Sequence, residues 1–351
     1  MMDKTRVVVV FGGCSTEYGV SLQSAASVVE HFKRDSYEVI LMGITKEGKW
    51  FRYFGGIEAI KNDTWHLDKS CIPAVFSPDR GQAAFIEFYE DRFVTTQIDV
   101  VFPVMHGKNG EDGTLQGLLE LAGIPFVGCD TLCSALCMDK DIAHKIAQTA
   151  GVRVPPSICA DKGMDIFEIE RKTENLKYPV YVKPAKSGSS FGITKVGYPG
   201  ELREAIFEAF RHDSKIVIEE GIDGFEVGCA VLGNSELIIG EVDEIELQQG
   251  FFNFNEKYTP ASSKIYMPAR VDMLTAQRIK DTALKLYNAF GCRGFARVDM
   301  FLTTSGKIVF NEINTIPGFT THSRYPNMLK GIGMSFENIL DKLILLAKEN
   351  K

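Results

Sequence analysis

The stretch VFNEINTIPGFTTHSRYPN at residues 309–327 begins like an ordinary strand and then changes character. Alternation places Phe310, Glu312 and Asn314 on one face of the strand, so a carboxylate and an amide share a side where apolar residues are expected. A proline–glycine turn follows, and the polar run behind it ends in Arg324. Two features therefore need an explanation: the acid and amide on one strand face, and the arginine beyond them.

A second strand-like segment, FARVDMFLT, precedes this stretch and is separated from it by a short polar segment. A two-residue turn at 305–306 would suit a hairpin, because glycine readily adopts positive φ. With that turn, Asp299 would face Glu312 and Arg297 would face Asn314. All four side chains would then lie on one side of the sheet.

Two carboxylates on paired strands have Cβ atoms roughly 5 Å apart and repel each other unless a cation lies between them. Oxygen ligands of this kind suit Mg²⁺, which also takes oxygens from substrate phosphates. We therefore predict a metal site at Asp299, Glu312 and Asn314. The alternative is a solvent-exposed polar face on which Arg297 neutralises the acids.

Composition limits the function classes that the chain can belong to. It has 351 residues, 45% hydrophobic and 24% charged, which is typical of a globular protein of two or three domains. A net charge of −7 argues against a general nucleic-acid binder. The N-terminal sequence lacks the features of a signal peptide, and no apolar stretch is long enough to span a membrane. We expect a cytoplasmic protein without a nucleic-acid or membrane partner.

Eight cysteines without a secretion signal predict free thiols. Cys129, Cys133 and Cys137 are spaced at i, i+4 and i+8, which resembles a set of metal ligands. Because no Cys-x-x-Cys pair accompanies them, we interpret them as a stripe of small residues on a buried helix face.

The chain divides into three predicted domains. Residues 1–125 contain RVVVVFGG followed by a helical pattern, which indicates an α/β domain whose parallel sheet is covered on both faces. Residues 126–230 contain strands, a Gly/Ser loop and an amphipathic helix, which indicates a small α+β domain. Residues 231–351 contain more strands, a long loop at 248–263 and a helix at about 274–290 that Gly291 ends.

Lys183 lies at the end of a predicted strand, before a loop rich in glycine and serine. Such a loop offers backbone N–H groups and hydroxyls to phosphate, although it is no Walker A sequence and can be an ordinary hairpin. Three acids at Glu219, Glu220 and Glu226 can accept from adenine or ribose, or can form a solvated strand edge.

Six motifs occur in one order along the chain: FGGCSTEYGVSL, HGKNGEDGTLQG, KPAKSGSSFG, EKY, ARVDMF and NEINTIPGFTTHS. Together they resemble the motifs of the D-alanine–D-alanine ligases of the ATP-grasp superfamily, over residues 7–345. Among these ligases the chain is most similar to the VanG-type D-alanine–D-serine ligases associated with vancomycin resistance. The resemblance implies a three-domain ATP-grasp fold, α/β and α+β in class, and a homodimer.

The resemblance also implies a reaction. The carboxylate of the first D-alanine attacks the γ-phosphate of ATP and gives an acyl phosphate. The amine of a second D-amino acid, D-serine or D-alanine, attacks that acyl group, and phosphate leaves. Two Mg²⁺ ions, for which Mn²⁺ is an alternative, would bind at Asp299, Glu312 and Asn314 and offset charge during transfer.

The resemblance assigns further residues to ATP. Lysines would contact the phosphates, serines would lie in the loop that covers them, and acids with nearby backbone would hold adenine and ribose. These are Lys140, Lys183, Lys257, Ser189 and Ser190 for the phosphates, and Glu219, Glu220, Ile222 and Glu226 for the nucleoside. The loop at 248–263 would act as a lid that excludes water from the acyl phosphate.

Glu17 would hold the ammonium of the first D-alanine, although an acid in the first turn of a helix is also stabilising by itself. Glu17, Ser189 and Tyr258 would form a hydrogen-bonded group that joins the three domains. Arg297 and the backbone at Gly318 would stabilise the oxyanion.

The pocket for the second substrate departs from the usual pattern, because Arg324 replaces the apolar residue that often follows Ser323 in these ligases. Ser323 would bind the substrate carboxylate, and His106 lies close to this pocket or is an ordinary loop histidine. A buried arginine needs a partner, for which Asp243 is suited, and Phe252 would shape the apolar wall. We expect this subsite to accept the hydroxyl of D-serine, unless Arg324 only forms a surface ion pair.

Three other functions compete with a D-alanine–D-serine ligase. The first is an ordinary D-alanine–D-alanine ligase, and the second is an ATP-grasp ligase for other substrates. The third is a nucleotide-binding regulator without catalytic activity. The complete set of predicted metal ligands, with Arg297 and Lys183, argues against the regulator.

Overall fold

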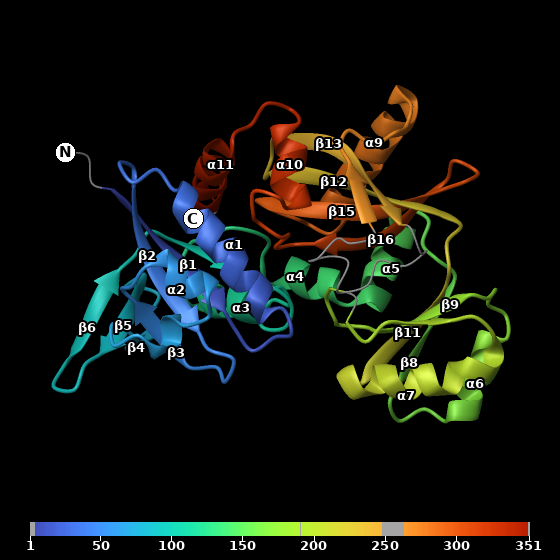
Figure 1. The fold of residues 1–351 in the computed structure, drawn as a ribbon, viewed down its shortest axis with the longest axis horizontal. Coiled ribbons are helices and arrows are strands. Elements are labelled where there is room, and N and C mark those ends of the chain that lie inside the picture. The colour runs from blue at the N-terminus through green and yellow to red at the C-terminus, as the bar shows by residue number, and fades with distance from the viewer. Residues whose placement is uncertain (1–3, 190, 248–262, 350–351) are drawn as a thin grey trace.

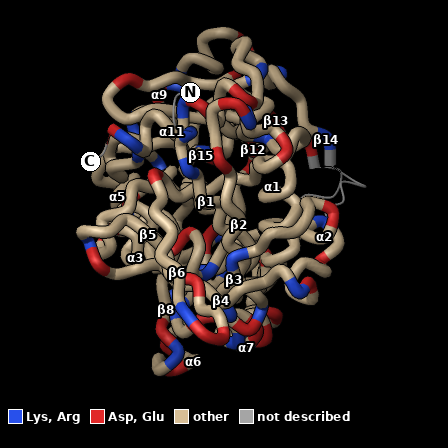
Figure 2. Tube along the Cα trace, turned by 90° about the vertical axis from the view of Figure 1, so that its left-hand side faces the viewer, with Lys and Arg blue, Asp and Glu red and all other residues tan. Residues whose placement is uncertain are grey.

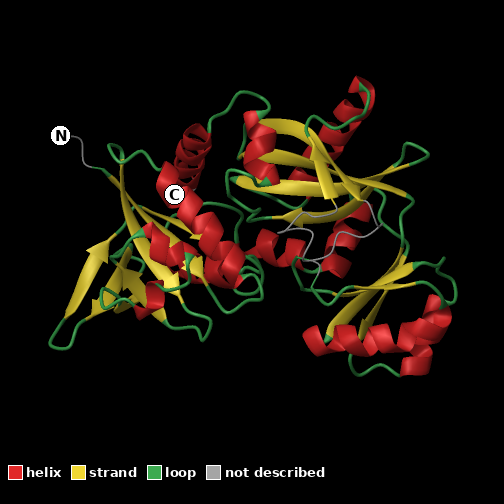
Figure 3. Cartoon of the chain, viewed as in Figure 1, coloured by secondary structure: helices red, strands yellow, loops and turns green. Residues whose placement is uncertain are grey.

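The computed structural model describes residues 4–189, 191–247 and 263–349, and contains three β-sheets that succeed one another along the chain (Figure 1). The first sheet and its helices form one body, and the second and third sheets lie beside each other with α4 (Thr131–Met138) and α5 (Lys140–Thr149) near their junction (Figure 3). Three sheets in this arrangement agree with the three-domain ATP-grasp fold that the resemblance implies. The domain boundaries predicted at 125/126 and 230/231 stay a prediction.

The first sheet has the strand order β6-β5-β4-β3-β2-β1-β7. Its strands β2, β1 and β7 are parallel, and the remaining pairs are antiparallel. The expected parallel sheet is therefore parallel only at one end, and the short connections between β2 and β3, β4 and β5, and β5 and β6 suit hairpin pairing. The strands are β1 (Thr5–Gly12), β2 (Tyr37–Ile44), β3 (Trp50–Tyr53), β4 (Ile72–Phe76), β5 (Ala84–Phe88), β6 (Phe93–Gln97) and β7 (Val100–Val104).

Strand β1 is covered on both faces, as its continuous apolar sequence predicted. Val7 and Val9 pack in one core with α1 (Tyr18–His31) and α11 (Phe336–Glu349). Val8 and Val10 pack in a second core with α3 (Thr114–Ala122). The C-terminal helix α11 thus returns to the N-terminal sheet. Two short elements, α2 (Ile57–Lys61) and η1 (Trp65–Leu67), complete this region.

The second sheet is antiparallel, with the order β10-β9-β11-β8. Its strands are β8 (Ser157–Asp161), β9 (Val180–Pro184), β10 (Thr194–Val196) and β11 (Lys215–Glu220). The helices α6 (Ile166–Thr173) and α7 (Leu202–His212) supply its apolar core, and η2 (Pro199–Glu201) leads into α7. The pair β9–β10 confirms the prediction of two strands joined by a Gly/Ser loop.

The third sheet is also antiparallel, with the order β14-β13-β12-β15-β16. Its strands are β12 (Gly224–Gly233), β13 (Leu237–Leu247), β14 (Ser263–Tyr266), β15 (Phe295–Thr303) and β16 (Ile308–Asn314). The helix α9 (Met273–Ala289) packs in one core beside it, and α10 (Arg324–Lys330) packs in another. Gly291 follows α9 with φ +67°, which confirms the predicted end of that helix.

The turn of the β15–β16 hairpin is one residue longer than predicted. The N–H of Thr303 donates to the carbonyl of Lys307 at 2.9 Å, so the loop comprises residues 304–306, and Gly306 has φ +72°. A three-residue hairpin loop of this kind ends in a left-handed residue, which explains the glycine. The predicted two-residue turn is therefore wrong.

A β-bulge at Asn311 restores the predicted pairing of the polar residues. Met300 pairs with Phe310, but the next partners are Asp299 with Glu312, and Arg297 pairs with Asn314. The turn has one residue more than predicted and β16 has one extra residue at the bulge, so the two shifts in strand register cancel. The prediction that the two acids face each other is confirmed, although the two-residue turn from which it was derived is wrong.

The bulge also changes the side on which one aromatic residue lies. Phe310 is fully buried in the core beside α9, together with Ile313. The expectation that Phe310 shares a face with Glu312 and Asn314 is therefore wrong, because a bulge shifts the alternation by one residue.

Charged residues of both signs are interspersed over the side of the molecule that Figure 2 presents. Among the described residues, no helix combines the length and the apolar character that a membrane crossing requires.

Candidate active site

The acid at the centre of the hairpin is buried and held by an arginine. Asp299 is 1% exposed and accepts hydrogen bonds from Arg297, Nε at 2.9 Å and Nη2 at 2.6 Å. Nδ2 of Asn314 donates to the same carboxylate at 2.8 Å. Burial opposes the charge of Arg297, but Asp299 beside it raises the pKa of that guanidinium overall. The alternative of a solvent-exposed polar face is thus wrong, although Arg297 does neutralise Asp299.

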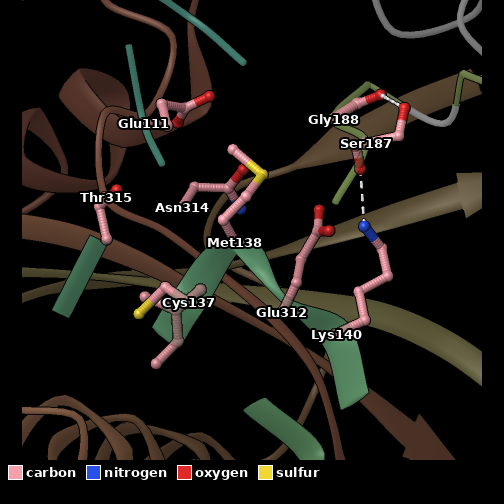
Figure 4. Close-up of a pocket in the computed structure, with 10 residues that line it drawn as sticks. Glu111, Cys137, Met138, Lys140, Ser187, Gly188, Glu312, Asn314 and Thr315 are labelled. Atoms are coloured by element: carbon pink, nitrogen blue, oxygen red, sulfur yellow. Dashed lines mark hydrogen bonds between the residues drawn. The ribbon is translucent and has the colours of Figure 1, made fainter. Parts of the chain in front are cut away.

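Glu312 and Asn314 line a pocket at the junction of the second and third sheets (Figure 4). Lys140 lies beside Glu312 in this view and donates from Nζ to the carbonyl of Ser187 at 2.6 Å. The carboxylate of Glu312, the amide of Asn314 and the carboxylate of Asp299 form a set of oxygen donors that fits a hard divalent cation. Coordination by Asp299 would require part of its bonding with Arg297 to be exchanged.

Glu111 borders the same pocket and was missed by the sequence predictions. Its carboxylate accepts from the backbone N–H of Gly107 at 2.7 Å and of Ile316 at 3.3 Å. Burial, and then the negative charges of Glu17 and Glu312, raise the pKa of Glu111 to about 8. The residue lies in the motif HGKNGEDGTLQG, and no local pattern in that motif distinguishes it from the other polar residues. Only its position close to Glu17 and Glu312 does so.

Glu17 joins the first glycine turn to the Gly/Ser loop of the second sheet. It is 5% exposed, and Oγ of Ser189 donates to it. Two glycines make this approach possible: a Cβ at Gly188 would lie 2.3 Å from Oε2 of Glu17, and one at Gly107 would lie 2.5 Å from it. Two members of the expected group of three therefore lie together. The third, Tyr258, lies outside the described residues.

Residues predicted to bind the nucleotide lie on and beside the two central strands of the second sheet, β9 and β11. Lys183 on β9 forms a buried ion pair with Glu219 on β11, and His144 lies 3.9 Å from the same carboxylate. Glu220 accepts from the backbone N–H of Lys177 at 2.9 Å. Ile222 follows β11 and is partly exposed. Ser190 and Lys257, also predicted to bind the nucleotide, lie outside the described residues, as does Phe252, which was predicted to shape the second-substrate pocket.

Arg324 is the first residue of α10, and its side chain is only 9% exposed. It donates from Nε and Nη2 to Asp243 at 2.7 and 2.8 Å, and from Nη1 to Glu226 at 2.8 Å. Its Nη2 also lies 3.3 Å from Asp299. Burial opposes the charge, but Asp243 and Asp299 raise the pKa of Arg324. The alternative of a surface ion pair is therefore wrong, and Glu226, expected at the nucleoside, contacts Arg324.

Gly228 on β12 has no side chain to separate Arg324 from Asp243 and Asp299. This glycine was not identified as a site residue from the sequence. It pairs with Asp243 on one neighbouring strand and with Asp299 on the other. A Cβ at Gly228 would lie 2.3 Å from Nη2 of Arg324 and within 3 Å of an oxygen of each acid, at 2.7 and 2.9 Å. The glycine thus allows one arginine to reach acids on two strands.

The segment that follows the β15–β16 hairpin carries Gly318 and Ser323, and His106 of the first domain contacts it. Oγ of Ser323 accepts from the N–H of Thr320 at 2.9 Å, and a Cβ at Gly318 would lie 3.2 Å from that oxygen. His106 is buried, with Nδ1 3.0 Å from the carbonyl of Ile316 and Nε2 3.1 Å from Oγ of Ser24. Burial lowers the pKa of His106, so the neutral ring joins the first domain to this segment.

Family models agree with this arrangement. A model described as the D-ala D-ala ligase N-terminus matches residues 6–129, and one described as the D-ala D-ala ligase C-terminus matches residues 146–345. The chain belongs to the D-alanine–D-alanine ligase family, whose members are ATP-dependent ligases of small amino-acid substrates that use divalent metal ions.

The chain is similar to ligases of several specificities. The crystal structure of the VanG D-Ala:D-Ser ligase from Enterococcus faecalis is 56% identical, with a TM-score of 0.91, and covers 98% of this chain and 100% of that one. The vancomycin B-type resistance protein VanB of Enterococcus faecalis is 44% identical over 99% of this chain and 100% of its own length. A D-alanine–D-alanine ligase of Caldicellulosiruptor bescii is 45% identical over 99% of this chain and 96% of its own length.

Proposed function

We propose that this protein joins D-alanine to D-serine at the expense of ATP. The product, D-Ala-D-Ser, would enter modified peptidoglycan precursors and contribute to vancomycin resistance. The buried contact of Arg324 with Asp243 carries this proposal, because it places a polar group where an apolar wall would suit D-alanine better. The likeness to a structure titled as a D-Ala:D-Ser ligase supports it.

In the first step, the carboxylate of D-alanine attacks the γ-phosphate of ATP, which gives D-alanyl phosphate and ADP. Glu17, buried and bonded to Ser189, would accept the D-alanine ammonium. Lys140 and Lys183 would hold phosphates at the pocket, with Lys257, Ser189 and Ser190. Glu219, Glu220, Ile222 and Glu226 would hold the nucleoside.

The donor set at the hairpin would hold two Mg²⁺ ions, or Mn²⁺ in their place, through Asp299, Glu312 and Asn314. When bound, these ions offset negative charge on the transferred phosphoryl group. Arg297, buried beside them, would stabilise the oxyanion together with the backbone N–H at Gly318.

In the second step, the amine of D-serine attacks the acyl carbon and phosphate leaves. Ser323 at the start of α10 would bind the D-serine carboxylate, with His106 supporting the loop beside it. Phe252 would form the apolar wall, and Tyr258 would act from the lid. The Arg324–Asp243 pair would meet the hydroxyl of D-serine.

A subsite that is built for a hydroxyl disfavours a methyl group, because its polar atoms then lose a partner at a cost of roughly 1–3 kcal/mol. This corresponds to a preference of about ten- to a hundredfold for D-serine. Residual synthesis of D-Ala-D-Ala is expected.

One observation favours a housekeeping D-alanine–D-alanine ligase instead. Arg324 already contacts Asp243, Glu226 and Asp299, so its charge is balanced without a substrate hydroxyl. In that case the cluster would serve the packing of α10 against the sheet, and the second pocket would not select for D-serine.

The deciding experiment uses the purified protein with ATP, Mg²⁺ and D-alanine, with and without D-serine, and identifies the products by mass spectrometry. Mainly D-Ala-D-Ser supports the proposal, and mainly D-Ala-D-Ala supports the housekeeping ligase. Release of ADP that depends on a D-amino acid separates both from a silent nucleotide binder. Light scattering on the same sample tests the homodimer that we expect.

A further inference from the structure

Four buried cysteines meet beside the third sheet. Cys133 and Cys137 lie on α4, and Cys129 precedes that helix, so the three do not form one helical stripe as the sequence suggested. Cys292, which is distant in sequence, joins them from the turn after α9. All four are free thiols and are 1–6% exposed.

The sulfur atoms are spaced like the ligands of a metal ion. Cys133 Sγ lies 3.6 Å from Cys292 Sγ and 3.9 Å from Cys137 Sγ. The sulfurs of Cys129, Cys133 and Cys292 all lie within 4.8 Å of one another. Tetrahedral zinc with Zn–S bonds of about 2.3 Å sets neighbouring sulfurs about 3.8 Å apart.

We propose that Cys129, Cys133 and Cys292, with Cys137 as a fourth ligand, bind a thiophilic cation of the Zn²⁺ class. Three chain segments provide these ligands: the residue before α4, α4 itself and the turn after α9. The site differs in chemistry from the oxygen ligands at Asp299 and Glu312, because soft thiolates select soft cations and carboxylates select hard ones.

The surroundings support thiolates at this place. The backbone N–H of Arg293 donates to Sγ of Cys129 at 3.5 Å, which is the kind of hydrogen bond that stabilises a metal-bound sulfur. Gly291 and Gly294 flank this turn with φ values of +67° and +65°, a backbone conformation that glycine adopts readily.

Cys137 and Met138 form part of the wall of the pocket in Figure 4, so the cluster lies next to that pocket. Binding would release the remaining thiol protons of the ligating cysteines to solvent. The bound ion would fix α4 to the segment that enters β15, the strand that carries Arg297 and Asp299. Its expected effect is on the stability of this junction.

Cobalt provides the test. The full-length protein is reduced, freed of metal with a chelator, and titrated with Co²⁺ in the presence of excess Mg²⁺. We expect one equivalent to produce a thiolate-to-cobalt charge-transfer band in the near ultraviolet, together with the strong visible bands of tetrahedral Co²⁺. One equivalent of Zn²⁺ should abolish both. Wild-type protein that shows neither band would overturn the proposal and leave a packed cluster of thiols.

Variants locate the site. Cys133→Ser and Cys292→Ser should each lower Zn²⁺ affinity at least about a hundredfold, since even the loss of an outer-shell partner costs about 10–100-fold. Cys159→Ser removes a free, half-buried thiol on β8 and should leave the affinity unchanged. Circular dichroism verifies that each variant is folded. A band that persists in folded Cys133→Ser and Cys292→Ser would place the metal elsewhere and refute the site.

Discussion

Arg324 donates two parallel hydrogen bonds to Asp243, from Nε to Oδ2 at 2.7 Å and from Nη2 to Oδ1 at 2.8 Å. The two residues lie 81 positions apart, one at the start of α10 and the other on β13. A bidentate pair fixes the guanidinium plane as well as its position. Because Ser323 precedes Arg324 directly, the same pair also fixes the position at which α10 starts.

Arg324→Leu should reduce the preference for D-serine over D-alanine by about ten- to a hundredfold, because an apolar side chain no longer offers a partner to the hydroxyl. The measurement is the ratio of kcat/KM for the two amino acids, at fixed D-alanine in the first site. Arg203→Leu removes an exposed arginine that pairs with Glu170 and serves as a control for lost charge. An unchanged ratio in folded Arg324→Leu would eliminate the hydroxyl subsite.

The same substitution should also lower the free energy of unfolding by about 3–5 kcal/mol, because it leaves Asp243 buried without its partner. The double variant Arg324→Leu/Asp243→Leu should recover part of this loss, since an apolar pair replaces a buried ion pair at little cost. Urea unfolding of both variants measures the difference. If the double variant were less stable than Arg324→Leu, Asp243 would have another stabilising role.

Gly228→Ala should disturb the charged cluster without removing any charge. The new Cβ would lie 2.3 Å from Nη2 of Arg324, so the guanidinium or the strand must shift, at a cost of about 1–3 kcal/mol. We expect both a lower melting temperature and a smaller D-serine preference. Gly163→Ala, where nothing lies within 4 Å of the new Cβ, is the matched control. Selectivity equal to wild type would mean that the cluster does not contact the second substrate.

Glu312→Gln should lower kcat for ADP release by about a hundredfold or more, because loss of a metal ligand removes several kcal/mol of charge stabilisation. The Mg²⁺ concentration for half-maximal rate should rise as well. Asp223 lies just before β12 and accepts a hydrogen bond from Thr304 in the hairpin turn, so Asp223→Asn should behave as wild type. A loss of rate without any change in Mg²⁺ dependence would argue against a metal at Glu312.

Glu111 should make stability depend on pH in the protein without nucleotide or metal. Its pKa is about 8 in the folded protein against the ordinary glutamate value of 4.5, so the folded state binds more protons between these values. Stability should therefore fall as the pH rises from about 5 to 8. Glu111→Gln should flatten this fall, whereas Glu90→Gln, at an exposed position, should not. Melting temperatures in a chelating buffer across this range provide the measurement, and parallel curves for wild type and Glu111→Gln would contradict the prediction.

Local patterns along the chain determined much of the fold. The continuous apolar run of β1 predicted a strand covered on both faces, and the helical repeats predicted α7 and α9 within a residue or two. Alternation and a two-residue turn predicted that Asp299 faces Glu312, and this pairing is present because the bulge in β16 offsets the longer turn. These features depend on neighbours close in sequence, whose periodicity is written directly in the chain.

Tertiary structure alone decided the features that join distant segments. The bulge at Asn311 restores a pairing that a three-residue turn would have lost. The strand register and the packing of Phe310 in the core beside α9 show this bulge. Glu111 lies close to Glu312 on the third sheet, and Cys292 lies close to α4 although it follows α9 in sequence. Burial of Arg324 among acids on separate strands likewise depends on how the sheet is assembled. No local periodicity in the sequence predicts these contacts, because their contribution to the free energy of folding arises only when segments far apart in the chain pack together.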